Sequence, residues 1–228
     1  MAILKKDYSI ETLLDKMDSG EFNAEDKTLL FRCVVRLFSQ NKKNSEKLTT
    51  LLLAKFDTLA ELICITRSEW KSFNFKDDQF YCSLVLLKEF AQRFYQASLP
   101  IGDVLQNEDL LIAYLVTCMA RERVEQFRVL FLDKKNMLIL DEIQGKGTVN
   151  QTPVYPREIA RRCLELKATS VILAHNHPSG SSVPSKPDIL MTQKVQQALN
   201  LIKVKVIDHY IIARTTHSSF RELGLLEL

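Results

Sequence analysis

The spacing of apolar residues divides this chain into two parts. Before Pro100, apolar positions recur every three or four residues, which is typical of helices that bury one face. The clearest runs of this kind are residues 29–38 and 84–94. Alternation of the strand type is weak, and Gly20 is the only glycine in this part. The pattern therefore predicts an all-helical region over residues 1–98.

Beyond Pro100 and Gly102, which mark the predicted boundary, the pattern changes. Short runs rich in β-branched and aromatic residues now alternate with helical runs. We predict strands at 126–133, 137–143, 169–174 and 204–213, and helices at 103–122, 156–166 and 186–201. Strands that alternate with helices indicate an α/β layer domain, here over residues 103–228.

Composition places the chain among soluble globular proteins, because 46% of its residues are hydrophobic and 26% are charged. No apolar run reaches the roughly 18–20 residues that cross a bilayer. The N-terminus becomes charged too early for a secretory signal. Five widely spaced cysteines without a C-x-x-C pair indicate reduced thiols. We therefore expect a cytoplasmic protein that has no membrane partner.

Charge argues against strong nucleic-acid binding. The chain has 31 Lys and Arg against 28 Asp and Glu, a net charge of +3. Binding to a phosphate backbone usually requires a clear excess of basic residues. The local cluster of Arg157, Arg161 and Arg162 is typical of a solvated helix face. We expect at most weak DNA binding.

The most informative segment is residues 175–188, with the sequence HNHPSGSSVPSKPD. His175 and His177 directly follow a predicted strand, whose period of two places both side chains on one side. Ser185 is predicted to cap the next helix, and Asp188 falls in its first turn, so that its carboxylate can return to the histidines. Two imidazoles and one carboxylate leave a fourth tetrahedral position open, as in catalytic zinc sites.

Two other interpretations apply to the same residues. The spacing of Ser185 and Asp188 also fits a helix capping box. A histidine pair could equally end a strand in solvent. Two of the four histidines in the chain are nevertheless separated by one residue, between an apolar strand and a Pro-Ser-Gly turn, and this coincidence favours a metal site. His209, inside an apolar strand, is predicted to be structural.

The pattern H-x-H, seven residues, S, two residues, D resembles the motif of JAMM (MPN+) metalloproteases. The fuller string resembles the RadC family, because HNHPSG and the later Thr192 match as well. Three further segments match in the expected order: VYPREI (154–159), IDHYII (207–212) and SFRELGLL (219–226). The resemblance covers about residues 103–228. It implies zinc held by His175, His177 and Asp188, and the deaminase-like α/β fold of MPN domains, with a mixed sheet flanked by helices.

The resemblance also implies catalytic residues. The family has a glutamate general base just before the strand that precedes the site, and Glu125 matches it, with Gln126 in place of the familiar histidine. Glu122 is the competing candidate, and a solvated helix-end glutamate is the other interpretation of either residue. Ser185 would donate a hydrogen bond to the oxyanion. The implied activity is hydrolysis of a protein or peptide substrate at a peptide or isopeptide-like amide.

RadC proteins usually begin with a helical region that contains a helix-hairpin-helix, in which a glycine turn presents backbone N–H groups to phosphate. The corresponding segment here, residues 59–80, has Phe73, Asn74 and Phe75 at the turn. We therefore predict a degenerate helix-hairpin-helix. The alternative functions are a DNA-repair-associated or DNA-binding accessory module whose metal domain is structural or non-proteolytic, and a catalytically silent interaction domain.

Overall fold

The computed structural model describes residues 10–20, 26–40, 45–75, 77–99, 103–146 and 154–226. Its internal contacts divide the chain into two compact units, Met1–Phe90 and Ala91–Leu228. The division falls inside a helix, α6 (Asp78–Ser98), before the boundary expected at Pro100 and Gly102, which lie outside the described residues. Within the described ranges, no helix combines the length and the apolar character needed to cross a membrane.

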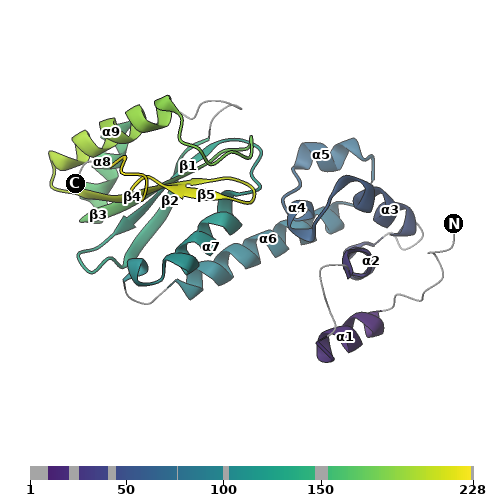
Figure 1. The fold of residues 1–228 in the computed structure, drawn as a ribbon. Helices are drawn as coiled ribbons and strands as arrows, with labels where there is room; N and C mark the ends of the chain where they lie inside the picture. The colour runs from purple at the N-terminus through teal and green to yellow at the C-terminus, as the bar shows by residue number, and fades with distance from the viewer. Residues whose placement is uncertain are drawn as a thin grey trace. The chain divides into compact units, whose positions relative to one another are not determined.

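The first unit is helical, as predicted (Figure 1). Its core is formed by aromatic and aliphatic side chains around Trp70, which is 1% exposed and contacts the rings of Phe73, Phe80 and Tyr81. Its helices, besides the first part of α6, are α1 (Ile10–Asp18), α2 (Lys27–Phe38), α3 (Ser45–Lys55), α4 (Leu59–Leu62) and α5 (Arg67–Ser72).

The turn between α5 and α6 is where the sequence has Asn74 in place of a glycine turn. Asn74 adopts φ +56°, a left-handed conformation that asparagine tolerates better than most residues. Phe73 and Phe75 on either side pack against the core of the unit. Asp77 is buried and accepts hydrogen bonds from Ser39 Oγ at 2.5 Å and from the backbone N of Phe80 at 3.0 Å. The turn is therefore built from core residues and a helix cap.

The second unit has a five-stranded mixed sheet in the order β2-β1-β3-β4-β5, with β3 and β4 parallel and the other pairs antiparallel. This confirms the predicted mixed α/β fold. Its strands are β1 (Gln126–Leu132), β2 (Leu138–Lys146), β3 (Ser170–Asn176), β4 (Lys205–Ile212) and β5 (His217–Ser219). Its helices, besides the end of α6, are η3 (Val104–Gln106), α7 (Glu108–Met119), α8 (Pro156–Leu166) and α9 (Lys186–Asn200).

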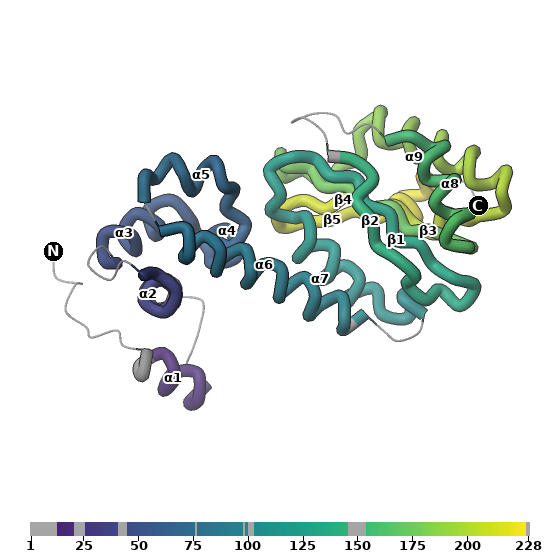
Figure 2. Tube along the Cα trace, turned by 180° about the vertical axis from the view of Figure 1, so that it is seen from behind, coloured from purple at the N-terminus to yellow at the C-terminus, as the bar shows by residue number. Residues whose placement is uncertain are grey.

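Helices cover both faces of this sheet. Helix α7 packs on one face, and α8 and α9 lie next to each other on the opposite face (Figures 1 and 2). Residues of β3 alternate between the two cores, so that Ile172 and Ala174 face α7 while Val171 and Leu173 face α8 and α9. The next residue of this second series is His175. The strand therefore brings His175 to the face that α9 covers.

Apart from shifts of strand ends, such as β3 reaching Asn176 instead of ending before His175, two details differ from the predicted elements. The single helix expected at 103–122 is divided into η3 and α7, because Asp103 and Asn107 each cap a separate helix by accepting from Leu105 N and Leu110 N. The three-residue strand β5 was not predicted, because it is too short for a periodic pattern to show.

Candidate metal centre

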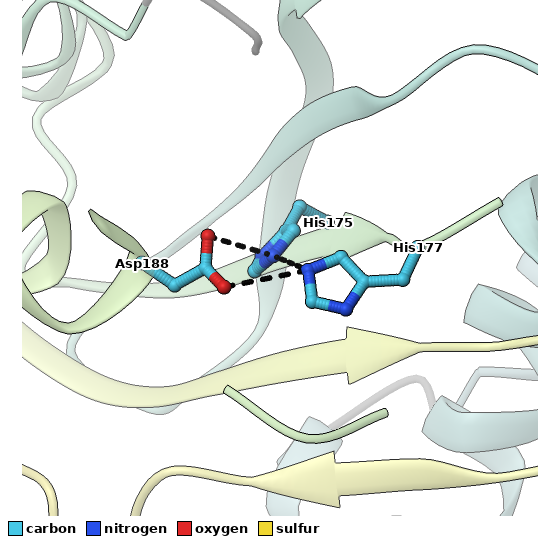
Figure 3. A group of neighbouring side chains, drawn as sticks. All are labelled: His175, His177 and Asp188. Atoms are coloured by element: carbon cyan, nitrogen blue, oxygen red, sulfur yellow. Dashed lines mark hydrogen bonds and ion pairs between the residues drawn. The ribbon is translucent and has the colours of Figure 1, made fainter. Parts of the chain in front are cut away.

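Two histidines meet where β3 ends. His175 is the penultimate residue of β3, in which every residue is buried, and His177 directly follows the strand. Their Nε2 atoms face each other at 2.9 Å (Figure 3). The pleat of an extended chain accounts for this, because alternate side chains leave it on the same side.

Asp188 approaches the same point from the first turn of α9. Its Oδ1 lies 3.4 Å from His175 Nε2, and its Oδ2 lies 3.3 Å from His177 Nε2 (Figure 3). Oδ2 also accepts from the backbone N of Ser185 at 2.8 Å and from Ser185 Oγ at 2.6 Å, and the N–H of Asp188 donates to Ser185 Oγ. Ser185 and Asp188 therefore form a helix capping box and a metal-ligand arrangement at once, because the capping box directs the Asp188 carboxylate at both imidazoles.

The outer ring nitrogen of His177 has a partner that fixes its proton. Nδ1 lies 2.8 Å from the carbonyl oxygen of Ser181. A carbonyl only accepts hydrogen bonds, so His177 Nδ1 must carry a proton and donate it. In the neutral ring, Nε2 then keeps its lone pair and directs it at the point where the three side chains meet.

The outer nitrogen of His175 contacts a third histidine, since its Nδ1 lies 2.7 Å from Nε2 of His209. His209 Nδ1 in turn lies 2.6 Å from Oγ1 of Thr192 on α9. The sequence predicted a structural role for His209. The residue is fully buried inside β4, and in addition it touches one of the candidate ligands.

The two histidines favour the charged form of the Asp188 carboxylate. Burial by itself would raise the pKa of Asp188, but hydrogen bonds and charges from His175 and His177 outweigh burial and hold that pKa well below its usual range. The hydrogen bond with Asp188 raises the pKa of His177. Burial lowers the pKa of His209 well below the usual value for histidine, so its ring is neutral.

The donor set fits a zinc ion. Within the described ranges, His175, His177 and Asp188 form the one group of three whose ligand atoms all lie within 4.8 Å of one another. Two imidazole nitrogens and a carboxylate oxygen are typical ligands of catalytic zinc. The carbonyl behind His177 is also the kind of partner that zinc-bound histidines usually have. The chain thus brings these predicted ligands together.

Glu125 lies in the segment between α7 and β1, close enough to interact electrostatically with the cluster. Its half-buried position raises the pKa of its carboxyl more than the charges of His175 and His177 lower it. Glu122 instead accepts a hydrogen bond from Gln126 Nε2 at 3.0 Å. Gln126, which replaces the histidine of the family pattern, therefore binds Glu122, the competing candidate for the general base.

Asn176, between the two histidines, was not identified from the sequence as a functional residue. Its side chain points away from them, and its Oδ1 accepts from the backbone N of Gln126 at 2.8 Å. Its Nδ2 donates to the carbonyl oxygens of Glu122 and Val124, each at 3.2 Å. Asn176 thereby fastens the segment that carries Glu125. The H-x-H motif itself was a signal, because its middle residue must face the opposite side of the strand.

The basic residues of α8 are paired with carboxylates. Arg161 interacts with Glu158 at 3.1 Å and also with Glu165, and Arg162 lies 2.8 Å from Glu142 and 2.7 Å from Glu165. Arg157 lies 3.5 Å from Glu158. The positive charge of these three arginines is thus balanced by nearby glutamates.

Comparison with known families identifies the domain that carries the candidate metal ligands. A family model described as the RadC-like JAB domain matches residues 105–225, which is more than half of the chain. The match includes all of the five-stranded sheet, both candidate histidines, Asp188 and Glu125.

Proposed function

This chain belongs to the RadC family, and on that premise we propose that its JAB domain is a zinc-dependent hydrolase that cleaves a peptide or isopeptide-like amide. The observation that carries the proposal is the convergence of His175, His177 and Asp188. Nδ1 of His177 binds the carbonyl oxygen of Ser181, and the Nε2 atoms of both histidines face the carboxylate of Asp188. A zinc ion bound there would supply a Lewis acid and make water a stronger acid.

In this proposal, Glu125 is the general base. It takes a proton from the attacking water and passes it to the leaving amine. A base works best when its pKa lies near the working pH, and burial shifts the pKa of Glu125 in that direction. The bonds of Asn176 to Gln126 and Val124 keep the segment of Glu125 in register with β3.

Ser185 has two roles in the proposal. Its hydroxyl donates to Asp188 Oδ2 at 2.6 Å and so orients that carboxylate. Because Ser185 is exposed, its hydroxyl can also rotate toward the oxyanion of a bound substrate, where a donor stabilises the developing charge.

The test combines metal analysis with an unbiased peptide-cleavage screen. Wild type and Glu125→Gln should both hold about one zinc per chain, since the glutamate is not a ligand in this scheme. Cleavage should fall by roughly 10²–10⁴-fold in Glu125→Gln, the usual contribution of a general base.

Glu122→Gln is the matched control, because it removes a carboxylate three residues away in the same segment. It should retain zinc and cleavage. Wild-type protein that binds no zinc would refute the proposal, and so would full cleavage by both Glu125→Gln and Glu122→Gln. Loss of cleavage in Glu122→Gln alone would assign the base to Glu122.

A further inference from the structure

A chain of three hydrogen bonds runs behind the proposed metal site, from α9 to β3. Thr192 Oγ1 contacts the carbonyl oxygen of Asp188 at 2.7 Å and His209 Nδ1 at 2.6 Å. His209 Nε2 then contacts His175 Nδ1 at 2.7 Å. Thr192 and His209 are each 0% exposed and His175 is 5% exposed, so bulk water does not compete for these contacts.

Two arrangements of protons are possible when both imidazole rings are neutral. In the first, the Thr192 hydroxyl donates to the Asp188 carbonyl, His209 Nδ1 donates to Thr192, and His175 Nδ1 donates to His209 Nε2. In the second, Thr192 donates to His209 Nδ1, His209 Nε2 donates to His175 Nδ1, and the proton of His175 lies on Nε2; the carbonyl oxygen of Asp188 then receives no proton from Thr192. The first arrangement leaves His175 Nε2 with a lone pair, and the second blocks that atom with a hydrogen.

Thr192 selects the first arrangement. A hydroxyl has one proton, and the contact with the carbonyl oxygen of Asp188, one helical turn earlier on α9, uses that proton because a carbonyl oxygen only accepts. The remaining contact of Thr192 Oγ1 must therefore accept the proton of His209 Nδ1. The same helix thus supplies the carboxylate of Asp188 and sets the tautomer of His175.

We propose that Thr192 and His209 are positioning residues that hold His175 as its Nδ1–H tautomer, so that Nε2 is free to bind a metal ion. His177 reaches the same state through the carbonyl of Ser181. Two lone pairs then face each other at 2.9 Å beside a carboxylate, an arrangement that repels itself until a cation enters. The inference rests on the proposed function only in taking zinc as that cation.

The first experiment measures zinc affinity by competition with a chromophoric chelator, on variants shown to be folded. His209→Leu removes the acceptor for His175 Nδ1, and Thr192→Val removes the acceptor for His209 Nδ1. Each should weaken zinc binding by roughly 10–100-fold, as loss of such a partner usually does. His209→Gln and Thr192→Ser keep an acceptor and should stay within a few-fold of wild type, by the same principle.

Val195→Ala is the matched control, because Val195 is fully buried on the same helix but belongs to the apolar core. It should lose stability without losing zinc affinity. Unchanged zinc affinity in both His209→Leu and Thr192→Val would overturn the inference, even in an active hydrolase. If His209→Leu does not fold, Thr192→Val decides alone.

The second experiment reads the tautomer directly in metal-free wild type, by long-range ¹H–¹⁵N correlation of the imidazoles at alkaline pH. His175 should show a protonated Nδ1 and an unprotonated Nε2. A proton on His175 Nε2 would overturn the inference. Because this measurement needs no metal, it decides the inference even if the protein binds no zinc and the proposed function fails.

Discussion

The two units of this protein differ in what they bury. In the described part of the first unit, buried polar side chains are few, namely Ser39, Thr49 and Asp77. Ser39 Oγ donates to Asp77 across the unit, and Thr49 Oγ1 donates to Ser45 O at 2.8 Å. The second unit buries a larger set: Gln126, Ser170, His175, Asn176, Thr192, Gln196, Asp208, His209 and Ser219.

Buried polar side chains point to a functional region because burial makes them costly. Burying a polar group costs free energy unless hydrogen bonds replace its water. Over its described residues, the first unit buries fewer polar residues in its aromatic and aliphatic core, although Trp70 Nε1 is buried there without a hydrogen-bond partner. In the second unit, His175 belongs to the candidate metal centre, and His209 and Thr192 form the hydrogen bonds behind it. Asn176 binds the segment that carries Glu125. Asp208 has another role, because it accepts from Ser219 Oγ at 2.5 Å and thereby fastens β5 to β4.

Removal of a candidate metal ligand should have the largest effect on the second unit and none on the first. His177→Ala should abolish zinc binding, and with it the zinc-dependent stabilisation of the second unit. For wild type, that stabilisation reaches about 4.1 kcal/mol when free zinc is about 1,000 times Kd. It can be measured by calorimetry with and without zinc.

The same titration tests whether the two units unfold separately. Trp70 is the only tryptophan and lies in the first unit, so its fluorescence reports the unfolding of that unit alone. We expect zinc to leave the Trp70 transition unchanged. A Trp70 transition that moves with zinc as far as the calorimetric one would show a single cooperative unit and contradict the two-domain division.

A core substitution in the first unit should have the opposite pattern. Phe80 is 0% exposed and its ring lies 5.5 Å from that of Trp70. Phe80→Ala should lower the free energy of unfolding of the first unit by about 3–5 kcal/mol through the cavity it leaves. Urea titration followed by Trp70 fluorescence measures this loss.

Zinc affinity should not change in Phe80→Ala. Leu86→Ala is the control on the same helix, since Leu86 is 68% exposed, and it should stay within about 0.5 kcal/mol of wild type. Weaker zinc binding by Phe80→Ala would show instead that the aromatic core of the first unit supports the candidate metal centre.

A smaller effect is expected from Asn176, which tests the polar core itself. Asn176→Ala leaves the backbone groups of Gln126, Glu122 and Val124 without their side-chain partner. A buried group left unsatisfied costs about 1–3 kcal/mol. Chemical denaturation of the second unit, followed by circular dichroism, should show a loss of this size. Asn200→Ala, at the exposed end of α9, is the control; an equal loss there would contradict the assignment.

How far the sequence could predict these features depended on distance along the chain. Helix α8 has the predicted bounds, because Pro156 begins it and its apolar period is clear. The candidate ligands His175, His177 and Asp188 lie within one short segment, so the periods of the strand and of the helix were enough to predict that they meet.

The contacts behind the ligands depend on pairing between distant strands. His209 reaches His175 only because β4 lies parallel to β3, and Asn176 reaches Gln126 only because β1 lies on the other side. No local period specifies these pairings. The left-handed conformation of Asn74 could not be predicted from the sequence either. Asparagine and glycine both adopt this conformation, but only glycine indicates it strongly.

The smallest effect expected is binding of DNA. In the first unit, the turn predicted for a degenerate helix-hairpin-helix is left-handed at Asn74, but Phe73 and Phe75 pack into the core and Asp77 caps α6. In the second unit, Arg161 and Arg162 are paired with glutamates. Neither arrangement offers several unpaired cations to a phosphate backbone.

We therefore expect DNA affinities no tighter than about 10⁻⁴–10⁻⁶ M near physiological salt, the range of non-specific contacts. Titration of duplex and single-stranded DNA at two salt concentrations measures both affinity and the number of phosphates contacted, since each contact on a duplex contributes a slope of about −0.9. Asn74→Gly restores the glycine without removing the flanking aromatics, so it should leave affinity unchanged. Submicromolar binding by wild type, lost when residues 71–78 are replaced by a neutral loop, would show instead that the first unit grips DNA through this turn. The contrast between an apolar scaffold and a polar functional centre would then fail, because both units would carry a binding site.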